Sequence, residues 1–210
     1  MAHPASTQRG SWDREYSKPD PLWKGPSRDD LPLLKGKRVL ELGCGNGKTA
    51  AALVRSTEEI VAVDFSRRGL EACRRTLTAP NLLLVEADVR NLPFADASFD
   101  QVVAFHVLGH LSKEERRAAV DEVRRVLRPG GGLLVRAFSV NDMRCGSGAR
   151  TEPGTYVKGT GILCHYFDAA ELEDLFRDFR RDALEEVRSE KRYDGADRLR
   201  AEWVGAYQKP

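Results

Sequence analysis

The sequence predicts an α/β domain: a doubly wound, mostly parallel sheet of seven strands with a final antiparallel strand and helices on both faces. Short apolar strands alternate with segments of helical periodicity from residue 37 to residue 138, and near-continuous apolar strands are typical of a parallel sheet covered on both sides. A glycine-rich segment follows the first strand, where doubly wound folds hold nucleotide-like ligands.

The composition favours one domain without a specialised partner. A chain of 210 residues is long enough for a single α/β core. Its 34 Lys and Arg nearly balance its 32 Asp and Glu, so the net charge does not indicate binding to nucleic acid or to an acidic membrane. Five Arg-Arg pairs lie among acidic residues, which is typical of solvated helix faces; a shallow RNA-facing patch is the alternative.

Cysteine usage and hydropathy indicate a cytoplasmic location. Cys44, Cys73, Cys145 and Cys164 show no C-x-x-C spacing, so reduced thiols and no metal site are expected. No apolar run reaches the ~18 residues of a membrane span, and the N-terminus lacks the apolar region of a signal peptide. We therefore expect no membrane partner.

Residues 1–35 read as an N-terminal arm before the domain at 36–210. The arm is rich in Pro, Ser and charge, yet it carries Trp12, Tyr16 and Trp23. Aromatic residues in a polar arm indicate a segment that docks onto the domain. It is either a lid over the site or a partly ordered tail that the aromatics pin down.

The first half of the domain alternates regularly. Periodicity predicts strands at 37–42, 59–63, 82–86 and 99–105 and helices at 47–55 and 66–77. The next helix, 113–127, opens with the capping-box pattern of Ser112 and Glu115. Pro129-Gly130-Gly131 ends that helix, and a strand at 132–138 follows.

The second half is less regular. Residues 140–164 are Gly-rich and polar without clear periodicity, and a loop this long in a compact domain is usually functional or disordered. A helix at 168–179, capped by Asp168, and two strands at 182–193 and 199–208 complete the predicted sheet.

The glycine-rich segment is the most informative motif. Gly43, Gly45 and Gly47 stand at alternate positions, where glycine allows sharp turns and close approach of a ligand to the backbone. The dinucleotide pattern is G-x-G-x-x-G, so here the third glycine comes one residue early. Glu41 before the loop would repel a pyrophosphate but suits a ligand with an ammonium or sulfonium group.

At these residues the chain resembles the class I S-adenosylmethionine-dependent methyltransferases, most clearly over 37–139. The resemblance implies S-adenosyl-L-methionine as cofactor. It also implies which loop residues bind the methionine part and the ribose of this cofactor: Glu41, Gly43, Cys44, Gly45 and Gly47.

The resemblance also implies roles for residues at the ends of the next strands. Asp64, followed by Phe65, would hold the ribose hydroxyls, although an acid at a helix N-terminus is the structural alternative. Asp88 and Val89 would contact the adenine, unless Asp88 is only an exposed turn acid. Phe105 would emerge beside the sulfonium methyl.

Three residues are candidate general bases: His106, His165 and Glu152. The imidazoles titrate near neutrality, but only geometry can show which of the three, if any, acts. Arg136 is unusual inside a strand, where an internal ion pair is expected more than contact with an anionic acceptor.

The acceptor expected is a small molecule, methylated by direct displacement, with the 140–164 loop setting its identity. The Asn/Asp-Pro-Pro-Tyr/Phe motif of enzymes that methylate base amines is absent. His165-Tyr166-Phe167 nevertheless resembles carboxymethyluridine tRNA methyltransferases, so a tRNA enzyme with an activating protein subunit is the alternative. A non-catalytic cofactor-binding module is a third reading, and a nicotinamide dehydrogenase conflicts with the glycine spacing.

Overall fold

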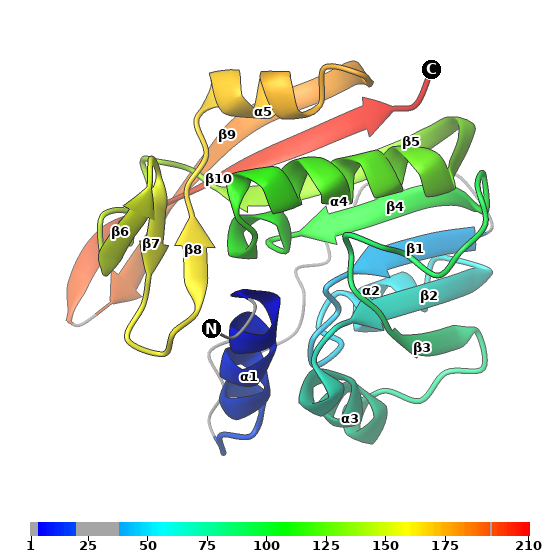
Figure 1. Ribbon diagram of the computed structural model, residues 1–210, viewed down its shortest axis with the longest axis horizontal. Helices are drawn as coiled ribbons and strands as arrows, with labels where there is room; N and C mark the ends of the chain where they lie inside the picture. The colour runs from blue at the N-terminus through cyan, green and yellow to red at the C-terminus, as the bar shows by residue number, and fades with distance from the viewer. Residues whose placement is uncertain (1–3, 20–37, 194) are drawn as a thin grey trace.

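A computed structural model describes residues 4–19, 38–193 and 195–210 and shows one seven-stranded sheet in the order β3-β2-β1-β4-β5-β10-β9 (Figure 1). Its strands are β1 (Arg38–Leu42), β2 (Glu59–Asp64), β3 (Leu82–Glu86), β4 (Phe99–Phe105), β5 (Leu127–Phe138), β9 (Arg180–Tyr193) and β10 (Ala196–Gln208). The pairs among β1 to β5 are parallel, whereas β10 is antiparallel to both β5 and β9. The predicted sheet, with its final antiparallel strand, is confirmed.

Helices cover both faces of this sheet. Neighbouring strand residues point to opposite sides, so apolar residues along a strand contribute to the core on each face. Val102 of β4 belongs to the core under α4 (Lys113–Val126) and α5 (Ala169–Leu175), whereas Val103 belongs to the core under α2 (Ala50–Leu53). On the same side as α2, α3 (Arg67–Thr76) packs against β2 and β3.

The helix caps follow the sequence pattern. At α4, Ser112 Oγ accepts a hydrogen bond from Glu115 N, and Glu115 Oε2 accepts one from Ser112 N at 2.9 Å. At α5, Asp168 Oδ1 accepts from Glu171 N at 2.8 Å. Both predicted N-termini are therefore confirmed.

Several boundaries differ from the prediction. β5 begins at Leu127 rather than 132, because Gly130 N and Gly131 O pair with Lys209 at 2.9 Å each and so prolong the sheet. α5 ends at Leu175, since Phe176 leaves the helical conformation. The helix expected at 47–55 is confined to α2, after a series of turns.

The segment 140–164 is not irregular. It contains β6 (Ala149–Glu152) and β7 (Thr155–Val157) and leads into β8 (Leu163–His165), which together form a small antiparallel sheet. Strands of three or four residues are too short to show alternation in a sequence, which is why the prediction was wrong. A 3₁₀ turn, η1 (Leu108–His110), packs beside β8.

The described part of the N-terminal arm is a helix, α1 (Pro4–Tyr16), which stands across from the carboxyl ends of the parallel strands (Figure 1). Trp23 and the predicted boundary between residues 35 and 36 lie outside the described residues. No helix in the described ranges is long and apolar enough to span a membrane.

Candidate active site

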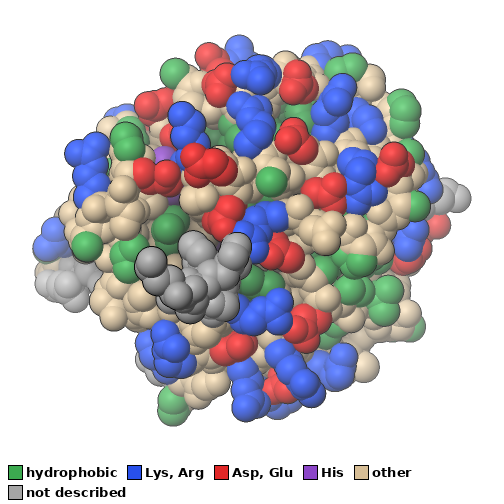
Figure 2. All heavy atoms as spheres, in the orientation of Figure 1, with side chains coloured by type: hydrophobic (Ala, Val, Ile, Leu, Met, Phe, Trp, Pro, Cys, Tyr) green, Lys and Arg blue, Asp and Glu red, His purple; other side chains and the backbone are tan. Residues whose placement is uncertain are grey.

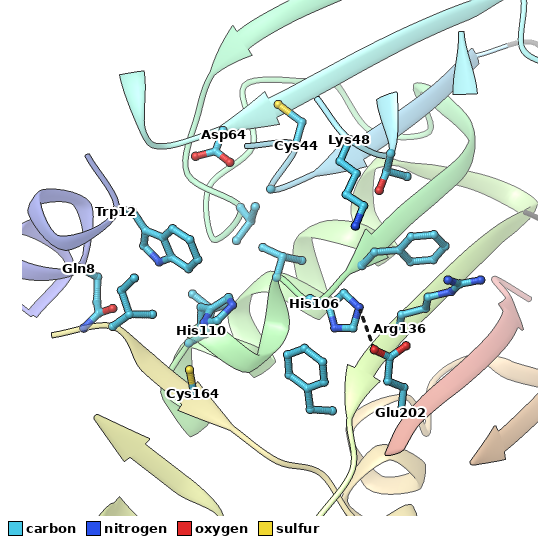
Figure 3. A pocket seen from close by; sticks show the side chains of 18 of the residues that line it. Gln8, Trp12, Cys44, Lys48, Asp64, His106, His110, Arg136, Cys164 and Glu202 are labelled. Atoms are coloured by element: carbon cyan, nitrogen blue, oxygen red, sulfur yellow. Dashed lines mark ion pairs between the residues drawn. The ribbon is translucent and has the colours of Figure 1, made fainter. Parts of the chain in front are cut away.

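A cavity of about 750 Å³ lies at the carboxyl edge of the parallel strands. Residues at the ends of four neighbouring strands line it, as expected for a ligand site in an open α/β sheet: Glu41 of β1, Asp64 of β2, Phe105 of β4 and Phe138 of β5. The small sheet and α1 contribute the opposite wall, so that the cavity has one end at the glycine loop and another beside β10 (Figure 3).

The glycine loop takes its shape from left-handed backbone conformations. Gly43 has φ +67°, and a Cβ there would lie 2.8 Å from Val107 Cγ2. Gly45 has φ +52°, and a Cβ there would meet the Tyr16 hydroxyl at 2.2 Å. Gly43 and Cys44 line the cavity, whereas Gly45 and Gly47 shape the loop behind its surface.

Glu41 is a buried carboxyl group on the cavity wall. Its side chain is 3% exposed, and Oε2 has no hydrogen-bond partner among the described residues. Burial, followed by the nearby Cys73 and Asp64, raises the pKa of Glu41 well above its usual value. A buried carboxyl oxygen without a hydrogen-bond partner is costly, so this geometry fits a cationic ligand group.

Asp64 is held by the loop that it faces. Its carboxylate accepts hydrogen bonds from Gly45 N at 2.7 Å and from Ser66 N at 2.8 Å. Burial outweighs these bonds and raises the pKa of Asp64 to about 6. A carboxylate has about four lone-pair positions, so Asp64 keeps acceptor capacity for ligand hydroxyls, and Phe65 lines the cavity next to it.

Asp88 and Val89 also line the cavity, but the Asp88 carboxylate already has a partner. Arg90 Nε donates to Asp88 Oδ1 at 2.8 Å, and the Arg90 guanidinium also pairs with Glu115. Although burial raises the pKa of Asp88, the bonds from Arg90 outweigh it and lower that pKa. The sequence analysis missed Arg90, whose position two residues after the acid was the available signal.

Helix α1 bridges the two sides of the cavity. Gln8 Nε2 donates to Gly161 O at 2.9 Å on the side of the small sheet, and Asp13 Oδ1 accepts from Ser66 Oγ at 2.7 Å on the other. Between them, Trp12 is buried edge-on against His110, with ring centroids 4.8 Å apart. Trp12 and Tyr16, four residues apart on one helix face, were the sequence signal for this wall.

His106 is the candidate base that reaches the cavity. It follows β4 with φ +61°, stacks on Phe138 at 4.4 Å, and holds Nε2 3.8 Å from Glu202 Oε1 (Figure 3). Burial, followed by the charge of Arg200, lowers the pKa of His106 well below its usual value. The imidazole is therefore neutral at physiological pH, which is the form a base requires.

The other two candidate bases lie elsewhere. His165 is 2% exposed; its Nδ1 lies 2.6 Å from Thr155 Oγ1 and its Nε2 2.7 Å from Glu171 Oε2. Its neighbours Cys164 and Tyr166 line the cavity, so His165 points to the opposite face of the strand. Glu152 joins the same buried network through Arg116. This placement contradicts the expectation that either side chain meets the acceptor.

Comparison with known proteins shows what this chain is similar to. The sequence matches the family model of a methyltransferase domain over residues 39–131. It is 39% identical over 121 residues to a demethylmenaquinone methyltransferase of Clavibacter sepedonicus, covering 57% of this chain and 49% of that one. It is 30% identical over 163 residues to the tRNA N(3)-methylcytidine methyltransferase Mettl2 of Drosophila melanogaster, covering 71% and 50%. The chain thus spans about half the length of these curated relatives.

A solved structure shares the fold over the whole chain. The 1,6-didemethyltoxoflavin-N1-methyltransferase of Burkholderia thailandensis, with 1,6-didemethyltoxoflavin and S-adenosylhomocysteine bound, superposes with a TM-score of 0.74. The match covers 100% of this chain and 91% of that one at 20% identity. At this identity the likeness shows the fold.

Proposed function

Because the chain belongs to the class I S-adenosylmethionine-dependent methyltransferases, we propose that it transfers the methyl group of S-adenosyl-L-methionine to a small-molecule acceptor. The observation that carries this proposal is the buried Glu41 carboxyl beside Gly43, because its Oε2 has no hydrogen-bond partner among the described residues. An ammonium group supplies the charge and the donors that this oxygen lacks.

The residues of the cavity fit the parts of the cofactor. Glu41 would accept from the ammonium of the methionine part, and the backbone at Gly43 and Cys44 lies open beside it. Asp64 would accept from the ribose hydroxyls, and the apolar Val89 would pack near the adenine. When bound, the cofactor supplies an electrophilic methyl group on a positively charged sulfur.

In the proposed step the acceptor's nucleophilic atom bonds to the methyl carbon as the carbon–sulfur bond breaks, and the electron pair stays on sulfur. The enzyme's contribution is alignment, which can supply several kcal/mol without covalent catalysis. Where the acceptor atom carries a proton, His106 is placed to take it, since its imidazole is neutral and on the cavity wall.

Helix α1 would act as the lid of this site. Its side chains Gln8, Trp12 and Tyr16 all line the cavity. Replacing Trp12 by alanine is expected to speed release of S-adenosylhomocysteine several-fold, because the wall beside His110 opens. Stopped-flow displacement measures this rate, and an unchanged rate would show that α1 does not cover the cofactor.

A small acceptor fits the cavity of about 750 Å³ and the mixed surface charge. Basic and acidic side chains alternate over the face shown in Figure 2. Several arginines of the Arg-Arg pairs form ion pairs, such as Arg67 with Glu71 and Arg125 with Glu122, as expected for solvated helix faces. Because the relative from Drosophila melanogaster is a tRNA methyltransferase, tRNA is the alternative acceptor. A cytoplasmic location and an activating subunit remain predictions from the sequence.

Calorimetric titration with S-adenosylmethionine and S-adenosylhomocysteine tests the proposed function. We expect micromolar binding of both, followed by transfer of labelled methyl to the small-molecule pool of a cell extract. Transfer to the RNA pool would support the tRNA alternative. Binding without transfer to either pool would support a non-catalytic module, and no binding would contradict the cofactor assignment.

The affinity for the cofactor is expected to fall as the pH drops through about 6, where Asp64 becomes protonated. A protonated carboxyl loses acceptor capacity for the ribose hydroxyls. Asp64→Asn is expected to bind about tenfold more weakly at pH 7.5 and to keep only the pH dependence that comes from Glu41, so that its affinity falls less than that of the wild type between pH 7.5 and 5.5. An equal pH dependence in both proteins would remove Asp64 from the ribose site.

The same shift affects the stability of the ligand-free protein. The pKa of Asp64 in the folded state is raised from 3.8 to about 6, so the folded state holds this proton more tightly than the unfolded state. The resulting stabilisation is fully present below about pH 4, and it is lost as the pH rises through 6.

A further inference from the structure

The two ends of the cavity differ in charge. Four carboxylates and two cations line the end at the glycine loop: Glu41, Asp64, Asp88, Glu115, Lys48 and Arg90. Among the described residues, the other end is lined by five cations and one carboxylate: Arg136, Arg144, Lys158, Lys191, Arg200 and Glu202. The fold thus separates an acidic half, suited to a cationic cofactor, from a basic half that the cofactor does not explain.

The cations of the basic half are brought together around Phe138. The guanidinium carbons of Arg144 and Arg200 lie 4.0 and 4.9 Å from the centre of its ring. The side chains of Arg144 and Arg200 are only 29% and 23% exposed, and each is paired with one carboxylate, Asp142 and Glu202 respectively. Charges that are largely shielded from water interact more strongly with an opposite charge.

Arg144 is held in this position before any acceptor arrives. Its Nε donates to Asp142 Oδ1 at 2.8 Å, and the other oxygen of this buried acid accepts from Ala201 N of β10 at 3.2 Å. Lys158 Nζ in turn donates to Arg144 O at 3.0 Å and to Ser147 O at 2.7 Å. Such preorganisation lowers the entropic cost of binding.

We propose that the acceptor is a small organic anion, whose carboxylate or similar group binds among Arg144, Lys158 and Arg200. This inference rests on the proposed function, because it assigns the acceptor to the half of the cavity that the cofactor leaves. An anion there places the nucleophilic part of the acceptor toward His106, which lies between the basic half and the glycine loop (Figure 3).

A pair of fluorescent probes with the same aromatic frame tests the inference. The anionic 8-anilinonaphthalene-1-sulfonate and the neutral N-phenyl-1-naphthylamine are titrated with and without saturating S-adenosylhomocysteine. We expect the anionic probe to bind more tightly than the neutral one. Raising NaCl from 50 to 500 mM should weaken the binding of the anionic probe only. Lys158→Gln and Arg200→Gln are each expected to raise the dissociation constant of the anion about tenfold, leaving that of the neutral probe within twofold.

Arg124→Gln is the matched control, because it removes one exposed positive charge on α4, outside the cavity. Unchanged neutral-probe binding shows that each variant is folded. Equal loss in the control, or equal affinity for the two probes, would overturn the inference. Failure of S-adenosylhomocysteine to bind would instead contradict the proposed function, while the comparison of the two probes would still decide the charge of the basic half.

Discussion

Replacing Arg116 by alanine is expected to lower the free energy of unfolding by about 3 kcal/mol, the range seen when one partner of a buried ion pair is removed. The Arg116 side chain is 3% exposed on α4 and donates to Leu111 O at 2.7 Å and Glu171 Oε1 at 3.1 Å. Its guanidinium carbon lies 5.5 Å from the centre of the Phe167 ring. The truncation would leave Glu171 and Glu152 without their shared cation.

Urea unfolding of the ligand-free protein measures this effect. Arg124→Ala is the control, because it removes the same side chain from an exposed position of the same helix and should change the free energy of unfolding by less than about 0.5 kcal/mol. A loss in Arg116→Ala no larger than in this control would mean that the network around His165 contributes little to stability.

The sheet could be predicted because its determinants are local. Continuous apolar segments mark the strands, and the pairing of Ser112 with Glu115 marks the start of α4. The small sheet β6–β8 could not be predicted, since its strands are short. Its position also depends on contacts with distant parts of the chain, such as the hydrogen bond from Gln8 to Gly161. The cavity wall formed by α1 could be predicted in part, because Trp12 and Tyr16 are aromatic residues in an otherwise polar arm.

The residues of the site also fall into those that could be placed from the sequence and those that could not. Glu41 and Asp64 could be placed because the carboxyl ends of neighbouring parallel strands meet at one edge of the sheet. His165 could not, because one step of strand register decides whether a side chain faces the cavity or the core. Arg136 lines the cavity with its guanidinium carbon 4.9 Å from the centre of the Phe105 ring. The choice between an internal ion pair and contact with an anionic acceptor at Arg136 stays a prediction.

Replacing Glu41 by glutamine is expected to weaken binding of S-adenosylmethionine by about 2–3 kcal/mol, roughly a hundredfold, because a charge-assisted hydrogen bond to the ammonium is lost. The ligand-free protein should be as stable as the wild type or more stable. Glutamine keeps the shape of the side chain, and it removes a buried carboxyl whose Oε2 has no hydrogen-bond partner among the described residues.

Proton release distinguishes this role from a purely structural one. Burial raises the pKa of Glu41 in the ligand-free protein, whereas an adjacent ammonium favours the charged carboxylate and lowers that pKa. Binding should therefore release protons from Glu41, which calorimetry at pH 7.5 in phosphate and in Tris detects as a buffer-dependent enthalpy. Glu41→Gln should lose this dependence, and Glu59→Gln, an exposed acid at the start of β2, should keep it. Full affinity in Glu41→Gln would contradict the assignment of the ammonium to this carboxyl.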